Sequence, residues 1–212
     1  MNWMLRDDVH AAAVGRDLVI LDLASDSYAC LRDAGAEGDD FARRVDRLSA
    51  AAQRTLIEAG LLVPGMSAGA PPPPTIAKRP LPALSSSSSD LRLLLDAAFA
   101  QLDLRSAGPD PSVAVLVGRA TAGVKTGEAD PALVLRTADQ FRRLAPWLPG
   151  RRACLQRAAL LRRLLQCRGL SAFWMFGVRT WPFRAHCWLQ IADVCLTDDP
   201  DHLRPYTPIL VC

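Results

Sequence analysis

A stretch rich in proline and serine, residues 64–89, divides the chain into two parts. It contains four consecutive prolines at 71–74 and ends in five serines at 85–89. Proline runs favour an extended backbone without internal hydrogen bonds, and serine runs lack the apolar surface that a core needs. We therefore expect residues 1–63 and 90–212 to fold as separate domains, joined by a linker over 64–89.

Composition limits the class of protein to which these two parts can belong. Half of the 212 residues are hydrophobic, so the chain can bury a core and is not expected to be disordered. No stretch approaches the roughly 18 uninterrupted apolar residues that a membrane span needs. The N-terminal residues lack a basic region followed by an apolar run, so we expect no secretory signal and a cytoplasmic protein. In that compartment the six scattered cysteines are expected to be thiols.

The net charge of +3 conceals an uneven distribution of charge along the chain. Residues 1–63 carry 7 arginines against 11 acidic residues, whereas residues 64–212 carry 18 basic against 11 acidic residues. The acidic first part is a poor match for a phosphate backbone, which is bound by clustered lysine and arginine. We therefore expect no nucleic-acid partner.

The first part shows the pattern of a small domain in which strands precede helices. Three apolar segments that end in turn residues predict short strands, at 9–14, 18–21 and 28–31. Two helices are expected to follow, with Asp39 or Asp40 as the N-cap of the first and Ser49 as the N-cap of the second. Gly60 is the expected end of the second helix, before a last short apolar strand. These elements predict a winged-helix-like module.

The second part contains a helix whose first turn carries a cysteine. Upstream of it, the apolar stretch at 112–120 is compatible with either a helix or a strand. From Cys154 to the helix-ending Gly169, Ala and Leu recur on one face, which predicts an amphipathic helix. Free N–H groups and the dipole at a helix start stabilise an anion, so a thiol there has a lowered pKa. Arg151 and Arg152 act in the same direction, and Cys154 is therefore the candidate nucleophile.

A histidine and an aspartate follow on predicted strands. The segment around His186 alternates in polarity, which places Trp188 on the same face and Cys187 on the opposite one. After a turn, the chain returns toward Asp198. In a nucleophilic triad the imidazole accepts the thiol proton and the carboxylate orients the imidazole. We therefore predict a catalytic triad of Cys154, His186 and Asp198.

The loop between the two strands decides which carboxylate faces the histidine. A three-residue loop at 191–193 places Asp198 opposite His186, whereas a two-residue loop at 192–193 places Asp199 there. We favour Asp198 and keep Asp199 as the alternative. The sequence contains no Cys-x-x-Cys pair, and we expect no metal site.

The order of these residues resembles that in the transglutaminase-like cysteine peptidase of lasso-peptide biosynthesis. The resemblance rests on the Cys154 helix, on Phe-Gly-Val at 176–178, on Pro-Phe-Arg-Ala-His-Cys-Trp-Leu at 182–189 and on Asp198. It covers residues 90–212 and implies a transglutaminase/papain-like fold that hydrolyses the bond between leader and core of a ribosomally made precursor. Two positions depart from the family pattern, because Cys187 stands where members usually have Ala and Gln190 where they have an acid.

The first part resembles the small leader-recognition domain of peptide-modifying systems, which is similar to the pyrroloquinoline-quinone chaperone fold. The matching residues are Leu18–Leu23 with Asp22, Ser27 with Tyr28, and Glu58–Leu62. Such a domain followed by a peptidase is the layout of the fused lasso B protein, which implies an α+β protein that binds a leader and then cleaves it. We expect the leader to bind as an additional β-strand beside the strand at 28–31. We expect Trp188 to form part of the wall of the catalytic site. The expected leader-binding residues are Tyr28, Ala29, Cys30 and Leu31.

The resemblance also implies partners for this chain. The leader of the precursor peptide is the expected ligand, and the released core is expected to pass to an asparagine-synthetase-like lasso cyclase. The chain has no phosphate-binding loop, so we expect it to bind no cofactor and any ATP to be used by the cyclase. Two other functions fit the same residues. One is a non-catalytic chaperone that delivers the precursor to the cyclase, and the other is an enzyme that transfers the acyl group to an amine.

Overall fold

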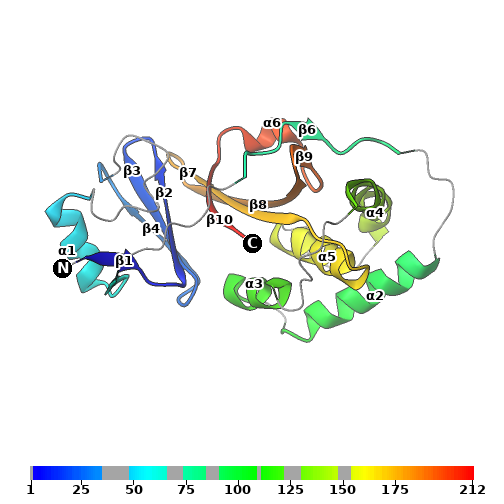
Figure 1. Ribbon diagram of the computed structural model, residues 1–212, viewed down its shortest axis with the longest axis horizontal. Helices are drawn as coiled ribbons and strands as arrows, with labels where there is room; N and C mark the ends of the chain where they lie inside the picture. Colours follow the sequence, from blue (N-terminus) through cyan, green and yellow to red (C-terminus); the bar gives the residue numbers. More distant parts are fainter. Residues whose placement is uncertain are drawn as a thin grey trace. The chain divides into compact units, whose positions relative to one another are not determined.

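The computed structural model describes seven segments of the chain, which are residues 2–34, 48–65, 74–84, 91–108, 111–121, 130–147 and 154–212. The expected helix near Asp39 and Asp40 lies outside them, as do Arg151 and Arg152. The chain forms two compact units, and each is described here by itself (Figure 1). Unit 1 comprises Met1–Pro73, Phe176–Ala185 and Pro205–Val211, and unit 2 comprises Pro74–Met175, His186–Arg204 and Cys212. None of the described helices is long and apolar enough to cross a membrane.

Unit 1 contains the strands that the N-terminal sequence predicts. A three-stranded antiparallel sheet has the order β2-β3-β4, and a second pair joins β1 to β5. The bounds are β1 Trp3–Leu5, β2 Val9–Val14, β3 Asp17–Asp22, β4 Ser27–Leu31, α1 Ala50–Glu58 and β5 Leu62–Pro64. The expected strands over 9–14, 18–21 and 28–31 are confirmed.

The helix α1 begins and ends where the local sequence predicts. The Ser49 hydroxyl accepts a hydrogen bond from the N–H of Ala52, which satisfies one of the free donors of the first turn. At the other end Gly60 has φ +68°, a left-handed conformation that a residue without Cβ adopts readily. Both signals lie within a few residues of the helix, and for this reason sequence alone could locate them.

Both faces of the small sheet are buried. One face packs against α1 and β5, and the cluster comprises Val9, Ala11, Leu18, Ile20, Leu48, Ala52, Leu56 and Leu62. The opposite face carries Val19 and Leu21, which are fully buried, and β10 contacts β2. On this face the indole Nε1 of Trp181 donates to Asp17 Oδ2 at 2.7 Å. Side chains of a strand point alternately to its two faces, and β3 carries apolar side chains on both. This explains why β3 is buried along almost its whole length.

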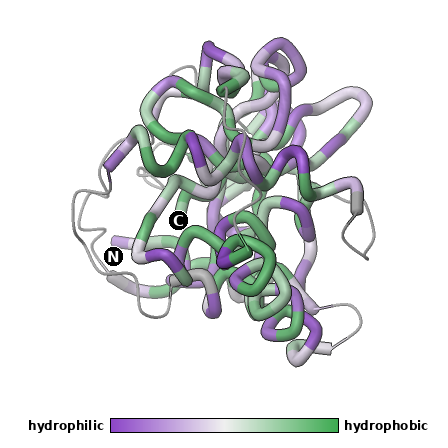
Figure 2. The backbone as a smooth tube through the Cα atoms, turned by 90° about the vertical axis from the view of Figure 1, so that its right-hand side faces the viewer, coloured by the Kyte–Doolittle hydropathy of each residue, from purple (hydrophilic) through white to green (hydrophobic). Residues whose placement is uncertain are grey.

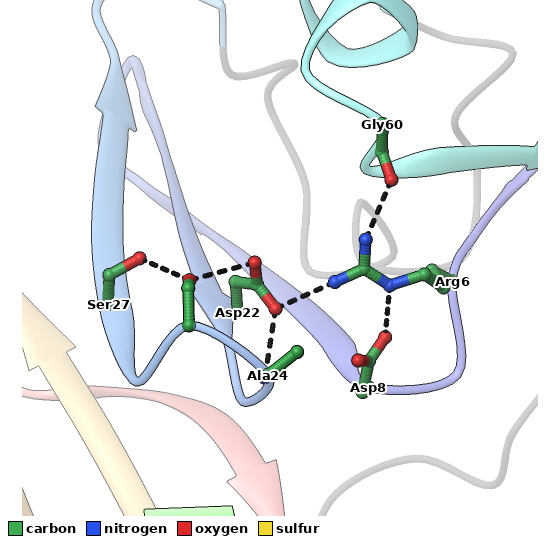
Figure 3. A network of polar contacts seen from close by, with 7 residues as sticks. Arg6, Asp8, Asp22, Ala24, Ser27 and Gly60 are labelled. Atoms are coloured by element: carbon green, nitrogen blue, oxygen red, sulfur yellow. Dashed lines mark hydrogen bonds and ion pairs between the residues drawn. The ribbon is translucent and has the colours of Figure 1, made fainter.

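A group of polar contacts ties the ends of these elements together (Figure 3). The Arg6 guanidinium contacts the carboxylate of Asp8, donates to Asp22 Oδ1 at 2.8 Å and donates to the carbonyl of Gly60 at 2.8 Å. The same Asp22 carboxylate accepts from the N–H of Ala24 at 3.0 Å. Arg6 therefore joins the turn before β2 to the end of β3 and to the turn after α1.

Unit 2 contains the remaining helices of the described part of the chain. The helices are α2 Leu91–Arg105, α3 Val113–Thr121, α4 Pro131–Leu144, the short η3 Ala145–Trp147, α5 Cys154–Cys167 and α6 Pro200–Leu203. The ambiguous stretch at 112–120 is helical. Figure 2 shows how hydrophobic and hydrophilic residues alternate along the helical turns, the pattern expected where one helix face packs inward.

A five-stranded sheet has the order β10-β7-β8-β9-β6. Its strands are β6 Arg79–Pro80, β7 Phe173–Arg179, β8 Arg184–Ile191, β9 Val194–Cys195 and β10 Thr207–Val211. The strand predicted around His186 is thereby confirmed. Strand β9 has only two residues, so most of β8 extends beyond it.

The described middle of the expected linker, residues 74–84, is bound to this sheet. Strand β6 pairs with β9 in parallel, and the N–H of Ala77 donates to Gln190 Oε1 at 3.1 Å. The guanidinium of Arg79 forms two hydrogen bonds of 2.6 Å with Asp193. Its proline content predicts an extended backbone, and the sheet edge supplies the hydrogen-bond partners that such a backbone lacks.

Candidate active site

Cys154 is the first residue of α5, where the sequence predicts a helix start. The next turns fix this helix, because Ala158, Leu161 and Leu165 are each fully buried. Cys154 itself is only partly exposed. The N–H groups of a first helical turn have no partners within the helix, so the thiol lies where the backbone stabilises negative charge.

The structure brings the three predicted triad residues together within unit 2. The Nε2 atom of His186 lies 2.6 Å from Asp198 Oδ2, and the side chains of His186 and Cys154 are hydrogen-bonded. Because Nε2 is bound by the carboxylate, Nδ1 is the ring nitrogen available to the thiol. The order thiol, imidazole, carboxylate is the one in which a proton can pass from sulfur to nitrogen while the ring stays oriented.

These contacts shift the pKa values toward a charged pair. The pKa of Cys154 falls to about 4, because hydrogen bonds from Cys187 and His186 stabilise its thiolate and outweigh the effect of burial. The pKa of His186 rises to about 9, because Asp198 and Cys154 both stabilise the imidazolium. Burial alone would raise the pKa of Asp198, but hydrogen bonds from His186, Asp199 N–H and His202 lower it. Thiolate and imidazolium are therefore the stable forms near neutral pH.

The carboxylate that contacts His186 is that of Asp198, the residue that we favoured from the sequence. The loop length on which that preference was based, three residues at 191–193, was wrong. The loop has two residues, Ala192 and Asp193, because Ile191 pairs with Val194. That register, if extended, would place Asp199 opposite His186. Strand β9 ends at Cys195, however, and the chain then bends, so that Asp198 reaches the ring.

Asp199 has a different task in the structure. It is the N-cap of α6, and its Oδ1 accepts from the N–H of Asp201 at 2.9 Å. The His202 ring of the same helix lies 3.3 Å from Asp198 Oδ1. Asp199 and α6 thus hold the segment that carries Asp198.

Trp188 supports the histidine from the buried side. The two rings are stacked with centroids 6.2 Å apart, and Trp188 is fully buried. Its Nε1 donates to Gln190 Oε1 at 2.9 Å, and the Gln190 amide donates to the carbonyl of Thr75 at 2.7 Å. In the structure Trp188 is fully buried and stacks on His186, whereas the sequence predicts that it forms a wall of the substrate site.

Sequence reasoning missed one residue of this site, Cys187. Alternation along a strand places it on the face opposite His186, yet its thiol and its backbone N–H both hydrogen-bond to Cys154. The Cys154 sulfur therefore interacts with two consecutive residues of β8, His186 and Cys187. The only signal in the sequence was that Cys187 stands where the peptidases that the sequence resembles usually have alanine.

A cavity of about 1080 Å³ in unit 2 borders the carboxylate end of the triad. Asp198 and Asp199 contribute to its wall, together with Gln156 and Arg157 from the first turn of α5. Most of the remaining wall is apolar and includes Leu81, Leu104, Leu116, Phe141, Leu160 and Leu196. The cavity thus adjoins the carboxylate of the triad, while Cys154 and His186 are not among its lining residues.

The predicted leader-binding residues lie on β4 in unit 1. Tyr28, Ala29 and Cys30 line a small cavity of about 100 Å³, together with Thr180, Trp181 and Phe183. Leu31 packs instead toward the core of the sheet. The rings of Tyr28 and Phe183 have centroids 5.4 Å apart. Strand β4 is the last strand of the sheet as described, which leaves Ala29 and Cys30 exposed.

Fold and site together define a class of protein. A thiol at a helix start, with an imidazole and a carboxylate on the following strands, is the arrangement of cysteine-dependent enzymes that form an acyl intermediate. Residues 98–211 match the model of the transglutaminase-like superfamily, and the chain belongs to this superfamily. No curated protein and no solved structure matches the chain. Among the described residues, no group of three His, Cys, Asp or Glu side chains could hold a metal ion.

The pH dependence of any acyl transfer at this site follows from the two shifted groups. Below the pKa of Cys154, about 4, the thiolate takes up a proton and nucleophilic attack slows. Above the pKa of His186, about 9, the imidazolium loses the proton that the leaving group needs. We expect a plot of kcat/KM against pH to be bell-shaped, with a plateau between these two pKa values. Both values describe the coupled pair of Cys154 and His186. A profile that rises only near the pKa of an ordinary thiol would contradict the thiolate–imidazolium pair.

Proposed function

We propose that this chain is a leader peptidase of lasso-peptide biosynthesis, which binds the leader of a ribosomally made precursor and hydrolyses the leader–core bond. The observation that carries the proposal is the contact of Cys154 with His186, itself bound to Asp198, in a transglutaminase-like domain. The resemblance of the sequence around these residues to the lasso peptidases selects the substrate class.

The reaction follows from the geometry of the three groups. The Cys154 thiolate attacks the carbonyl carbon of the leader–core bond, and the oxyanion is stabilised by N–H groups at the start of α5, with that of Cys154 the nearest. The His186 imidazolium then donates its proton to the departing core amine, which leaves a thioester on the leader carboxyl group. Water, deprotonated by the neutral imidazole, hydrolyses the thioester and releases the leader. Asp198 stabilises the imidazolium in both steps.

The N-terminal strands supply the leader-binding surface in this proposal. The exposed residues of β4 and its small cavity suit an extended peptide that adds as a further strand, with a side chain placed against Tyr28. Binding the leader on the same chain raises the local concentration of the cleavage junction at Cys154. Weak contacts around the junction are then sufficient for cleavage.

The remaining steps of maturation belong to partners. The freed core amine is the group that an asparagine-synthetase-like cyclase would join to a side-chain carboxyl group, with ATP used by that enzyme. This chain then acts before the cyclase, and it works with cytoplasmic precursor. In this scheme it needs no cofactor, because thiol, imidazole and carboxylate complete the hydrolysis.

A second function is also compatible with membership of the transglutaminase-like superfamily, namely transfer of the acyl group from the thioester to an amine rather than to water. The two reactions give products of different mass. We expect the full chain, incubated with a lasso precursor peptide, to yield leader and core fragments whose masses sum to that of the precursor plus one water. Mass spectrometry in the presence of an added primary amine provides the test. A leader fragment that carries the amine would establish acyl transfer instead of hydrolysis.

A further inference from the structure

The side-chain amide of Gln190 lies near the end of β8 and is fully buried. Its oxygen accepts two hydrogen bonds, from the N–H of Ala77 at 3.1 Å and from the indole Nε1 of Trp188 at 2.9 Å. Its nitrogen donates two, to the carbonyls of Thr75 at 2.7 Å and of Ala192 at 3.1 Å. An amide oxygen has two acceptor sites and an amide nitrogen has two donor hydrogens, so the whole capacity of the amide is used.

These partners determine which kind of side chain fits at position 190. Two of them are N–H donors and two are carbonyl acceptors. An amide satisfies both pairs at once, whereas a carboxylate has no hydrogen to donate to a carbonyl. The peptidases that the sequence resembles usually have an acid at this position. The glutamine of this chain therefore suits a set of partners to which residues 75–77 contribute two members.

The indole of Trp188 connects this amide to the histidine of the triad. His186, Trp188 and Gln190 alternate along β8, so their side chains lie on one face of the strand. The rings of His186 and Trp188 are stacked, with centroids 6.2 Å apart and 24° between their planes. The indole is fully buried, and its N–H needs an acceptor, which Gln190 provides. This hydrogen bond fixes the direction in which the indole points.

His186 needs a second restraint, because its printed contact with Asp198 holds one atom of the ring. That contact joins Asp198 Oδ2 to Nε2 at 2.6 Å. The torsion that turns a histidine ring about its Cβ–Cγ bond has broad minima, so one hydrogen bond leaves the plane of the ring loosely defined. The nearly parallel face of Trp188 defines this plane. The direction of the other ring nitrogen, Nδ1, depends on the same plane.

We propose that Gln190 is a positioning residue for the reaction at Cys154, which acts through Trp188 to hold the imidazole of His186 in the plane that proton transfer requires. The inference rests on the proposed roles of Cys154 and His186 as nucleophile and base. It extends the support of the triad to residues 75–77, whose backbone supplies two of the four partners of the amide. The segment that precedes β6 thus takes part in ordering the histidine.

The experiment measures the reactivity of Cys154 without any peptide substrate. The full chain is alkylated with iodoacetamide at a series of pH values, and the labelled Cys154 peptide is quantified by mass spectrometry. The wild type is compared with Q190M, which keeps the length of the side chain but not its hydrogen bonds, with H186A and with H186A/Q190M. Q53M is the matched control, because it makes the same change in α1 of unit 1, where the Gln53 amide donates to the carbonyl of Leu48 at 3.3 Å. Circular dichroism checks that each protein folds.

We expect the wild-type midpoint near pH 4, because the pKa of Cys154 is about 4. H186A raises the midpoint by about two to three pH units, because the thiolate loses the imidazolium beside it. Q190M raises it by about one unit, since a tilted ring keeps only part of its contact with the sulfur. In the H186A background Q190M has no further effect, because no imidazole is left to orient. Q53M leaves the midpoint unchanged.

Two further variants test the route through the indole. W188F keeps a ring beside His186 but has no N–H for Gln190, and we expect it to raise the midpoint as Q190M does. Q190E is the conservative variant, because burial favours the neutral carboxyl group, which can accept from Trp188 and donate one hydrogen bond. We expect its midpoint to stay within about half a pH unit of the wild type. Where Q190M does not fold, a W188F midpoint equal to that of the wild type overturns the inference.

The outcomes separate this inference from the proposed function. A raised midpoint in H186A but not in Q190M overturns the role of Gln190 and leaves the triad in place. An equal shift by Q190M in both backgrounds also overturns that role, because the effect does not pass through His186. A wild-type midpoint near that of an ordinary thiol overturns both the inference and the proposed function. A Q190M shift confined to the wild-type background, in a protein that cleaves no lasso precursor, supports the role of Gln190 and overturns the proposed substrate.

Discussion

The C154A variant is expected to lose leader cleavage by roughly 10⁴-fold or more, because the acyl intermediate of the proposed reaction forms on the Cys154 sulfur. Cys154 is the thiol that combines a helix start, a hydrogen bond to His186 and partial exposure. Initial rates of product formation, followed by mass spectrometry with a lasso precursor peptide, provide the measurement. The residual rate of C154A is set by direct attack of water on the peptide bond, assisted weakly by the remaining contacts of the site with the substrate.

C195A is the control for this prediction, because it makes the same chemical change at a buried thiol of strand β9 that is not one of the three triad residues. We expect it to cleave at close to the wild-type rate. Leader binding, measured by fluorescence anisotropy with a labelled leader peptide, should be the same in C154A and in the wild type. Unchanged cleavage in C154A would instead support a chaperone that delivers the precursor without cutting it.

The D198N variant is expected to lower kcat by about 10²- to 10⁴-fold with little change in KM. Asparagine is nearly isosteric with aspartate, but it removes the negative charge that stabilises the His186 imidazolium at 2.6 Å. The pKa of His186 should therefore fall, and the alkaline limb of the rate profile should move to lower pH. Steady-state kinetics across this range measure both effects in one experiment.

D199N is the matched control for D198N, because the change is identical and the residue is adjacent. Asp199 caps α6 through the N–H of Asp201, and asparagine is an equally good N-cap. We expect D199N to retain most of the activity and the same alkaline limb. A larger loss in D199N than in D198N would assign the orienting role to Asp199, the alternative that the sequence left open.

Local signals made much of unit 1 predictable. The serine before α1, the glycine after it and the alternating apolar residues of β2 and β3 each act within a few positions, and all three are confirmed. The second face of the small sheet was not predictable. It is covered by residues from 176–185 and 205–211, and these contacts join positions far apart in the sequence.

The identities of the three triad residues could be predicted from the sequence, but their arrangement in space could be predicted only in part. The order of Cys154, His186 and Asp198 along alternating helix and strand patterns was sufficient to nominate them. The path of the chain after β9 was not, because a two-residue strand followed by a bend leaves no periodic signal. Cys187 escaped for a related reason, since alternation describes the faces of a strand and says nothing of its edge.

The hydrogen bonds of the Gln190 amide determine where the chain can be cut to make a shorter fragment. It joins Trp188, which stacks on His186, to the backbone of Thr75 and Ala77. A fragment cut just before α2 would keep every triad residue, yet it would strip β9 of its neighbour and leave a buried amide without those partners. A working fragment therefore has to include residues 75–80, which lie before α2 in the chain and support β9 and Gln190.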